Sequence, residues 1–260
     1  MKRFRAASWT MAVLALAATG AAVLAASDPV ATKTFRYDIL IGDRAVGEMR
    51  LEVMTVANLT ILEEEFSAPF RAGGTRQQAG FTSQVVYKGE EKPAPSRAEV
   101  TTRFGRFKIM AGKVTFTETG GQWTGKVEAT GFADTEGHPF AEAREFTRTL
   151  STTGDLLLTP AAFLYFAPRL LPKPGKIEKV VHVELPDDIG FPAMLDFNPD
   201  CVLQRHAADS GGKADITLHR VYAGGNIVPL LKMTVDASGR VEEMHLGKFT
   251  LRRQASALEE

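Results

Sequence analysis

Histidine and cysteine are the residues of this chain best suited to metal chemistry, and their spacing does not form a metal site. None of the five histidines stands in a His-x-His arrangement, which places two ligands on one face of a strand, or in a His-x3-His arrangement, which does so on a helix. His206, His219 and His245 lie on segments that we expect to be neighbouring strands, so only the fold can bring them together. A single cysteine excludes a disulfide framework and a cysteine-rich metal site. We therefore expect no metal and no other cofactor.

Motifs for nucleophilic and phosphate chemistry are missing as well. No Gly-x-Ser-x-Gly elbow occurs, and the Gly-Gly pairs lie in expected hairpins rather than between a strand and a helix. Cys201 is interpreted as a small buried apolar residue. The stretch 187–200 mixes acids, aromatics and turn formers, as binding loops do, and it leaves an envelope hydrolase open as a minor alternative. Our main expectation is a protein that is not an enzyme.

The first 27 residues have the pattern of a secretory signal peptide. Lys2, Arg3 and Arg5 make a positive start, and an uncharged, mostly apolar run over 9–24 follows. Small residues at 25–27 close the segment, so we expect cleavage close to Ala25 to Ser27 and a periplasmic or secreted protein. A retained N-terminal anchor is the alternative, although the run is at the short end for a span of roughly 20 residues. We expect no stable membrane span after cleavage.

Composition and charge narrow the class of protein further. Apolar residues make up 44% of the 260 residues and charged residues 24%, which is typical of a globular protein. The 31 basic residues balance the 31 acidic ones, and loss of the leader removes three bases and no acid, which leaves a net charge of −3. A protein that binds nucleic acid normally carries a basic excess, so we expect no nucleic-acid partner.

Period-two alternation dominates the chain after the leader. Apolar and polar side chains alternate over 35–41, 49–53, 114–117 and 181–185, and alternation of this kind gives a strand one buried and one solvated face. Glycine-containing turns separate the runs at positions 41–43, 120–121, 209–212 and 236–239. Successive hairpins predict an antiparallel meander. We expect one β-rich domain over 28–254 and a frayed tail over 255–260.

One helix is expected, at about residues 159–171. Thr159 is a good N-cap, Pro160 suits the first helical position, and Pro168 is expected to kink or end the helix. The segment is apolar all round, so it must be buried on several sides. The predicted fold class is therefore mostly β, a curved antiparallel sheet or half-barrel with one short buried helix on its concave face.

Three segments resemble a group of exported bacterial β-rich proteins of unknown function. They are the strand and turn over 35–42 followed by Val46-Gly47, the helix that starts at Thr159-Pro160, and the closing hairpin over 227–241. Proteins of this group are similar to the half-barrels of lipoprotein carriers in the cell envelope. The resemblance implies a periplasmic or secreted β-rich protein and supplies no catalytic residue.

The aromatic content indicates either a packed core or an apolar binding pocket. The chain has 16 Phe but only 4 Tyr and 2 Trp, and Phe fills dry volume, either as core or as the wall of an apolar pocket. We predict that a hydrophobic or amphipathic envelope ligand, such as a lipid, binds in the concavity. The predicted ligand-binding residues are Phe163, Phe166, Leu170, Arg169 and Phe191.

Arg71, Arg76 and Arg169 are expected to hold a charged head group at the rim of this concavity. The alternative is a structural or interaction module with a packed core, which pairs an exposed strand edge with another envelope protein. An empty apolar concavity favours ligand binding, whereas a solid core with an uncovered edge favours the module.

Overall fold

The computed structural model describes residues 31–72, 75–89, 92–105, 107–133, 139–171, 173, 175–184, 196–247 and 249–255. Fifteen strands and one helix make up this part of the chain. In chain order the elements are β1 (Ala31–Ile41), β2 (Arg44–Val56), β3 (Leu59–Ala72), β4 (Thr75–Lys88), β5 (Ala94–Phe104), β6 (Phe107–Thr119), β7 (Gln122–Ala133), β8 (Pro139–Thr153), β9 (Asp155–Leu158), α2 (Thr159–Leu170), β10 (Ile177–Glu184), β11 (Asp196–Arg205), β12 (Ala214–Val221), β13 (Ile227–Val235), β14 (Val241–Leu246) and β15 (Phe249–Arg253).

All fifteen strands belong to one sheet. The sheet consists of two meanders, β1 to β8 and β9 to β15, which join through the pairing of β1 with β15. The order is β8-β7-β6-β5-β4-β3-β2-β1-β15-β14-β13-β12-β11-β10-β9. Every neighbouring pair is antiparallel except β9 and β10, which are parallel. The first and last strands, β1 and β15, pair in the middle of the sheet, with Tyr37 opposite Arg253. The predicted antiparallel meander is therefore confirmed.

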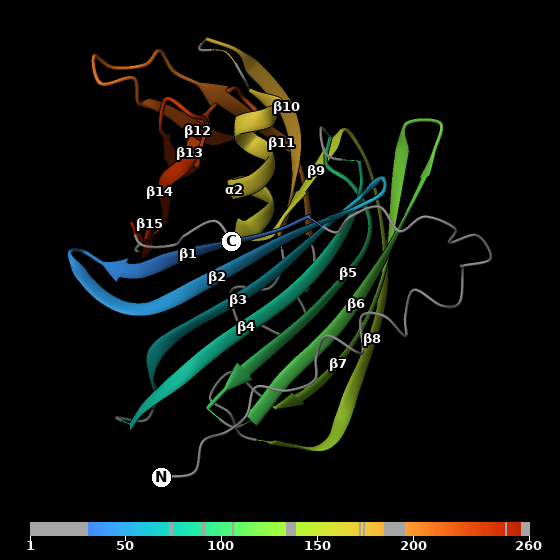
Figure 1. Cartoon of the computed structure of the whole chain (residues 1–260). Helices are drawn as coiled ribbons and strands as arrows, with labels where there is room; N and C mark the ends of the chain where they lie inside the picture. The colour runs from blue at the N-terminus through green and yellow to red at the C-terminus, as the bar shows by residue number, and fades with distance from the viewer. Residues whose placement is uncertain are drawn as a thin grey trace. The chain divides into compact units, whose positions relative to one another are not determined.

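The sheet curves without closing into a barrel, which confirms the predicted fold class (Figure 1). Its two edge strands, β8 and β9, are consecutive in the chain and are separated by Gly154 alone. Cα atoms of β8 come within 8 Å of β11, and those of β9 within 8 Å of β5. The two edges of the sheet must therefore approach each other, and helix α2 follows directly where they do.

The strands form where the sequence alternates. On β1 the buried residues Tyr37 and Ile39 lie on either side of the half-buried Asp38, and on β2 the buried Met49, Leu51 and Val53 alternate with more exposed residues. The turn after β1 carries Gly42 at φ +59°, a left-handed conformation that glycine adopts without strain. Cys201 on β11 is buried, as expected from the sequence.

Helix α2 lies on the concave side of the sheet, beside β10 and β11 in Figure 1. Its Cα atoms come within 8 Å of β3, β9, β10 and β14, so strands from both meanders contact it. The predicted range of about 159–171 agrees with the observed helix. The predicted N-cap was wrong, because Leu158 is the N-cap and Thr159 already belongs to the first turn. Pro168 lies inside the helix, which continues to Leu170.

The helix and the strand before it form the centre of the core. Leu156, Leu157 and Leu158 are fully buried, and every residue from Ala161 to Pro168 is buried. The ring of Phe166 packs against Tyr87 of β4 at 4.7 Å between ring centroids. A helix that is apolar on all sides is stable only when it is covered on all sides, and the curved sheet supplies that cover.

The described residues form one compact unit. The expected signal peptide and residues 256–260 of the expected tail lie outside the described residues, so cleavage and fraying stay predictions. Within the described part of the chain, no helix is long and apolar enough to cross a membrane.

At Gly47 of β2 the backbone of β3 leaves no room for a side chain. A Cβ atom added there would lie 2.1 Å from the carbonyl oxygen of Ser67 and 2.8 Å from the Cα of Ala68. Both contacts are with backbone atoms, so relief requires the two strands to move apart. Gly80, which pairs with Ser67 from the other side, is open, because its nearest atom would be the Phe66 carbonyl oxygen at 3.7 Å.

We predict that Gly47→Ala lowers the free energy of unfolding by at least about 2 kcal/mol, because overpacking of backbone against backbone cannot relax locally. Gly80→Ala is the matched control and is expected to leave stability unchanged or to raise it by up to about 1 kcal/mol. Urea denaturation of the two variants and the parent measures both effects. Equal stabilities of the two variants would contradict the close approach at Gly47.

The buried Tyr37 phenol makes the stability of the fold depend on pH in the alkaline range. Burial raises the pKa of its phenol to about 12, and nearby Arg253 lowers it only in part. In the unfolded chain a tyrosine ionises near pH 10. Above pH 10 the unfolded state therefore loses a proton that the folded state retains, and stability falls until about pH 12.

We predict that Tyr37→Phe removes up to about 3 kcal/mol of the stability loss between pH 10 and pH 12. Denaturant titrations at stepped pH measure the difference between variant and parent. Between pH 7 and pH 9 the two stability curves should run parallel. Parallel curves all the way to pH 12 would show that the Tyr37 phenol is not protected by burial.

Candidate ligand-binding pocket

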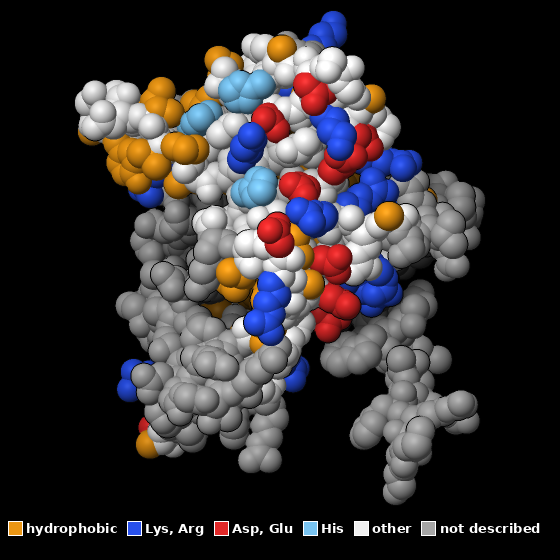
Figure 2. All heavy atoms as spheres, turned by 90° about the vertical axis from the view of Figure 1, so that its left-hand side faces the viewer, with side chains coloured by type: hydrophobic (Ala, Val, Ile, Leu, Met, Phe, Trp, Pro, Cys, Tyr) orange, Lys and Arg blue, Asp and Glu red, His pale blue; other side chains and the backbone are white. Residues whose placement is uncertain are grey.

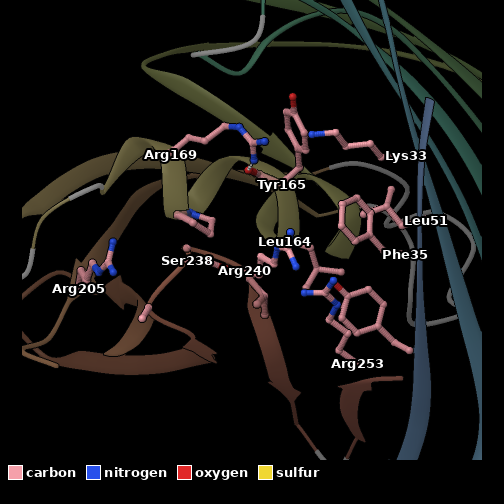
Figure 3. A pocket seen from close by; sticks show the side chains of 15 residues that line it. Lys33, Phe35, Leu51, Leu164, Tyr165, Arg169, Arg205, Ser238, Arg240 and Arg253 are labelled. Carbon is pink, nitrogen blue, oxygen red and sulfur yellow. Dashed lines mark hydrogen bonds between the residues drawn. The ribbon is translucent and has the colours of Figure 1, made fainter. Parts of the chain in front are cut away.

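A pocket of about 510 Å³ lies between helix α2, strands β1 and β2, and the turn that joins β13 to β14 (Figure 3). Its volume falls in the range of about 300–1,000 Å³ that is usual for small-molecule sites. The lining residues are Lys33, Phe35, Tyr37, Leu51, Leu164, Tyr165, Pro168, Arg169, Arg205, Ala237, Ser238, Gly239, Arg240, Val241 and Arg253.

The strand period and the helix period explain which side chains line the pocket. On β1, alternation places Lys33, Phe35 and Tyr37 on the same face, because successive strand side chains point to opposite sides. Leu51 of β2 lies opposite Phe35 in register and extends this apolar wall. On α2, Leu164 and Pro168, like Tyr165 and Arg169, are four residues apart and so share one stripe of the helix.

Hydrogen bonds to the Asp236 carboxylate hold the turn from β13 to β14 and thereby fix the backbone position of Arg240. The Asp236 carboxylate accepts hydrogen bonds from the backbone N–H of Ser238 at 2.8 Å, the Ser238 hydroxyl at 2.6 Å and the backbone N–H of Arg240 at 3.0 Å. Partial burial raises the pKa of Asp236, but the hydrogen bonds from Ser238 and Arg240 outweigh it and lower the pKa overall. Gly239 completes the turn at φ +82°.

Two arginines of the pocket also donate to backbone carbonyl groups in the last turns of helix α2. Arg169 donates to the carbonyl oxygen of Tyr165 and stacks over the Tyr165 ring, 3.6 Å from its centroid. Arg205 of β11 donates through Nη1 to the Leu171 carbonyl oxygen at 2.8 Å. The Leu171 carbonyl belongs to the C-cap residue, and a basic side chain at a helix C-terminus satisfies such a carbonyl group, which lacks a partner in the helix. These two side chains therefore serve the fold as well as the pocket.

The remaining basic residues surround the apolar wall. Arg253 of β15 lies opposite Tyr37 in register, and its guanidinium is 5.7 Å from the centroid of the Phe35 ring. Lys33 extends from β1 toward Tyr165, and Arg240 lies near Leu164 (Figure 3). Lys33 and Arg240 are exposed to solvent. The pocket thus has an apolar wall with cationic groups around it.

The charge of the pocket differs from that of the outer surface. Among the described residues that line it, five are basic and none is acidic. On the face drawn in Figure 2, by contrast, basic and acidic side chains lie next to one another. Among the described residues outside the pocket lining, ion pairs link Lys213 to Glu242, Lys232 to Asp215 and Arg252 to Glu243. An arrangement of cations around an apolar wall suits an amphipathic molecule.

The structure separates the predicted ligand-binding residues into two groups. Arg169 lines the pocket. Phe163, Phe166 and Leu170 lie in the packed core, with exposed fractions of 2%, 0% and 8%, and none of them lines the pocket. Phe191 lies outside the described residues. Contact of these four side chains with a ligand stays a prediction, and their neighbours Leu164 and Tyr165 supply the helix surface of the pocket.

Sequence analysis missed four of the five basic residues. Lys33 lies just before the alternating run that predicted β1. Extension of the alternation by two residues toward the N-terminus would have placed Lys33 on the same face as Phe35. Arg205, Arg240 and Arg253 join the pocket only through long-range strand pairing, which no local signal reveals. Arg71 and Arg76 pair in register on β3 and β4, but their side chains lie outside the described part.

No group of three His, Cys, Asp or Glu side chains in the described part of the chain is arranged to hold a metal ion. His206 donates to or accepts from Thr217 at 3.2 Å, and His245 does the same with Thr250 at 3.0 Å, so each has a neighbour on its own sheet face. Burial, and secondly the nearby His206, lower the pKa of His219. Most of the acid-rich stretch 187–200 lies outside the described residues.

Comparison with known proteins supports the fold. No family model matches the chain, and no curated protein matches it significantly. A solved structure from Brucella abortus, a β-barrel-like protein of the domain of unknown function DUF1849, is similar with a TM-score of 0.52 and 11% sequence identity. The match covers 88% of this chain and 97% of the Brucella chain. The β-rich architecture is therefore shared, across nearly the whole length, with a bacterial protein of unknown function.

Proposed function

We propose that this protein is a non-enzymatic binding protein that holds a hydrophobic or amphipathic molecule in the pocket beside helix α2. The observation that carries the proposal is the pocket of about 510 Å³, with a wall formed by Phe35, Tyr37, Leu51 and Leu164. Small-molecule sites are concave and mostly apolar, with a few polar groups that orient the ligand. The leader at the start of the sequence supports a periplasmic or secreted location, where such a ligand would be a component of the cell envelope.

The binding energy in this proposal comes from burial of an alkyl chain. Each methylene group removed from water contributes about 0.8 kcal/mol. That value corresponds to about a fourfold gain in affinity per methylene, until the chain fills the pocket. The tyrosine and arginine side chains around the wall would then orient the polar end of the ligand.

A second candidate function rests on strand β8. It forms one edge of the sheet over 15 residues, and most of its described side chains are exposed. An edge of this length offers main-chain groups to a partner strand, as the interaction-module hypothesis requires. Glu142, Arg144 and Glu145 on this edge are charged, however, and charges on an edge strand discourage pairing. We therefore favour ligand binding.

We predict that neutral n-alkanols bind with an affinity that rises about fourfold per methylene from hexanol upward. Phe35→Ala should weaken binding by about tenfold, because it removes the aromatic part of the wall. Phe249→Ala is the matched control, since Phe249 is also half-buried, lies on neighbouring β15 and does not line the pocket. Displacement of the neutral fluorophore N-phenyl-1-naphthylamine measures the affinities.

Neutral probes keep this experiment independent of the basic side chains. The same weakening in both variants would indicate a loss of stability rather than of a contact in the pocket, and would count against the site. An absence of any chain-length dependence would overturn the proposed function. Formation of a protein dimer that is abolished by substitutions in β8, with no alkanol bound, would favour the interaction module.

A further inference from the structure

The turn that joins β12 to β13 exposes a group of apolar side chains. Eight consecutive residues, 222–229, are exposed to solvent, and Tyr222, Ile227 and Val228 are 43%, 61% and 42% exposed. These three are among the five large hydrophobic residues that are exposed in the described part of the chain. We propose that this hairpin tip, residues 222–229, docks the protein on a lipid bilayer by inserting into the interface of the membrane. The inference goes beyond the pocket and does not depend on a ligand there.

The hairpin tip extends past its pairing with the strands on either side. Strand β14 ends at Leu246, opposite Leu231, so the register of β13 with β14 does not include residues 227–230. On the other side, the register of β11 with β12 ends at Arg220. Four strand residues span about 13 Å, whereas segments that lie in a membrane interface enter it to a depth of roughly 5–10 Å. The hairpin is therefore long enough to insert while the sheet behind it stays in water.

Both faces of the hairpin tip are apolar. Val228 pairs with Arg220 and Ile227 with Val221, and because successive strand side chains alternate, Ile227 and Val228 lie on opposite faces. A protein surface covers one face of such a hairpin and leaves the other in water. A bilayer surrounds an inserted hairpin and covers both faces. The two-sided apolar character therefore favours lipid over a protein partner.

Pro229 argues against a partner strand at the free edge of the hairpin. This proline is exposed and lies in the part of β13 that extends past β14. Proline has no N–H to donate, and on an edge strand it discourages pairing with another chain. An occupant of the tip must then be held through side chains, which is how lipid contacts an inserted segment.

The charge of the hairpin suits lipid head groups. No acidic residue lies between Ile216 and Val235 in the sequence. Arg220 lies at the base of the tip, with its guanidinium 5.0 Å from the centroid of the Tyr222 ring. Tyrosine is enriched where head groups meet acyl chains, and a long arginine side chain reaches toward phosphate groups while its stem stays in apolar surroundings. Arg220 can therefore contact phosphates while Ile227 enters the interface.

The backbone of the hairpin tip is already closed on itself. The Tyr222 N–H donates to the carbonyl oxygen of Asn226 at 2.8 Å, and the Gly225 N–H donates to the carbonyl oxygen of Tyr222 at 3.0 Å. Gly224 and Gly225 have φ values of +95° and +82°, which this tight turn requires and which glycine adopts without strain. Backbone groups without partners are costly in lipid, so these hydrogen bonds lower the cost of insertion.

A fluorescent label at the tip reports insertion directly. Asn226→Cys carries the polarity-sensitive dye nitrobenzoxadiazole at the tip, and Ser210→Cys carries it in the exposed turn at the other end of β12. The native Cys201 is buried, which protects it from labelling. Vesicles of phosphatidylcholine and phosphatidylglycerol in equal parts are the probe. We expect the emission at position 226 to rise and shift to the blue, and the emission at position 210 to stay unchanged.

Substitutions on the two faces test the geometry of insertion. In the protein labelled at position 226, Ile227→Ser and Val228→Ser should each weaken the affinity for vesicles by at least about fivefold, because each removes an apolar side chain from the lipid. Ile177→Ser is the matched control, since Ile177 is 59% exposed but lies on β10, and it should leave the affinity unchanged. Urea denaturation should give the same stability for all three variants, because the replaced side chains are exposed.

Several outcomes would overturn the proposal. Unchanged emission at position 226 would show that the tip stays in water, and equal changes at positions 226 and 210 would show adsorption without a preferred site. Loss of affinity in only one of Ile227→Ser and Val228→Ser would mean that the hairpin lies flat on the surface. A blue shift that appears without vesicles and grows with protein concentration would assign the tip to a second copy of the chain. None of these results bears on the pocket, which the alkanol titration tests.

Discussion

Helix α2 is apolar on every side, and the need to cover it on every side governs the rest of the fold. A buried Phe or Leu side chain contributes about 1.5–3 kcal/mol when it leaves water, so exposure of one face of this helix would cost a large part of the stability of a domain. A flat sheet covers only one face of a helix. Strands from both meanders, including β3, β10 and β14, contact α2, and this requires the sheet to curve around it.

The pocket lies where the sheet no longer packs against helix α2 and the helix surface meets solvent. Along α2 the Phe163 and Phe166 face is fully packed, whereas Leu164, Tyr165 and Arg169 also border the pocket. Arg169 and Arg205, which donate to backbone carbonyl groups of Tyr165 and Leu171, bring positive charge to this border. The end of the helix is therefore shared between the fold and the pocket, and Lys33 of β1, Arg253 of β15 and Arg240 of the β13–β14 turn are the other basic residues of the described lining.

Local patterns predicted the strands and the helix, because alternation in β1 and the all-apolar run of α2 are visible in short windows of sequence. The helix N-cap was misplaced by one residue, since Thr159 has a favourable side chain but Leu158 has the extended backbone. For the site, Arg169 was found because it lies on the helix itself. Arg205, Arg240 and Arg253 were not, because the pairing of β1 with β15 brings together segments some 200 residues apart. The apolar helix residues were correctly expected inside, but the sequence does not tell a core contact from a pocket wall.

Native mass spectrometry of the protein after gentle purification, without detergent, tests the central claim most directly. The account predicts a one-to-one adduct of small-molecule mass that is released by organic solvent. A protein that carries no adduct under these conditions, and that acquires none when incubated with an extract of envelope lipids, would contradict the claim that the pocket beside α2 is a binding site.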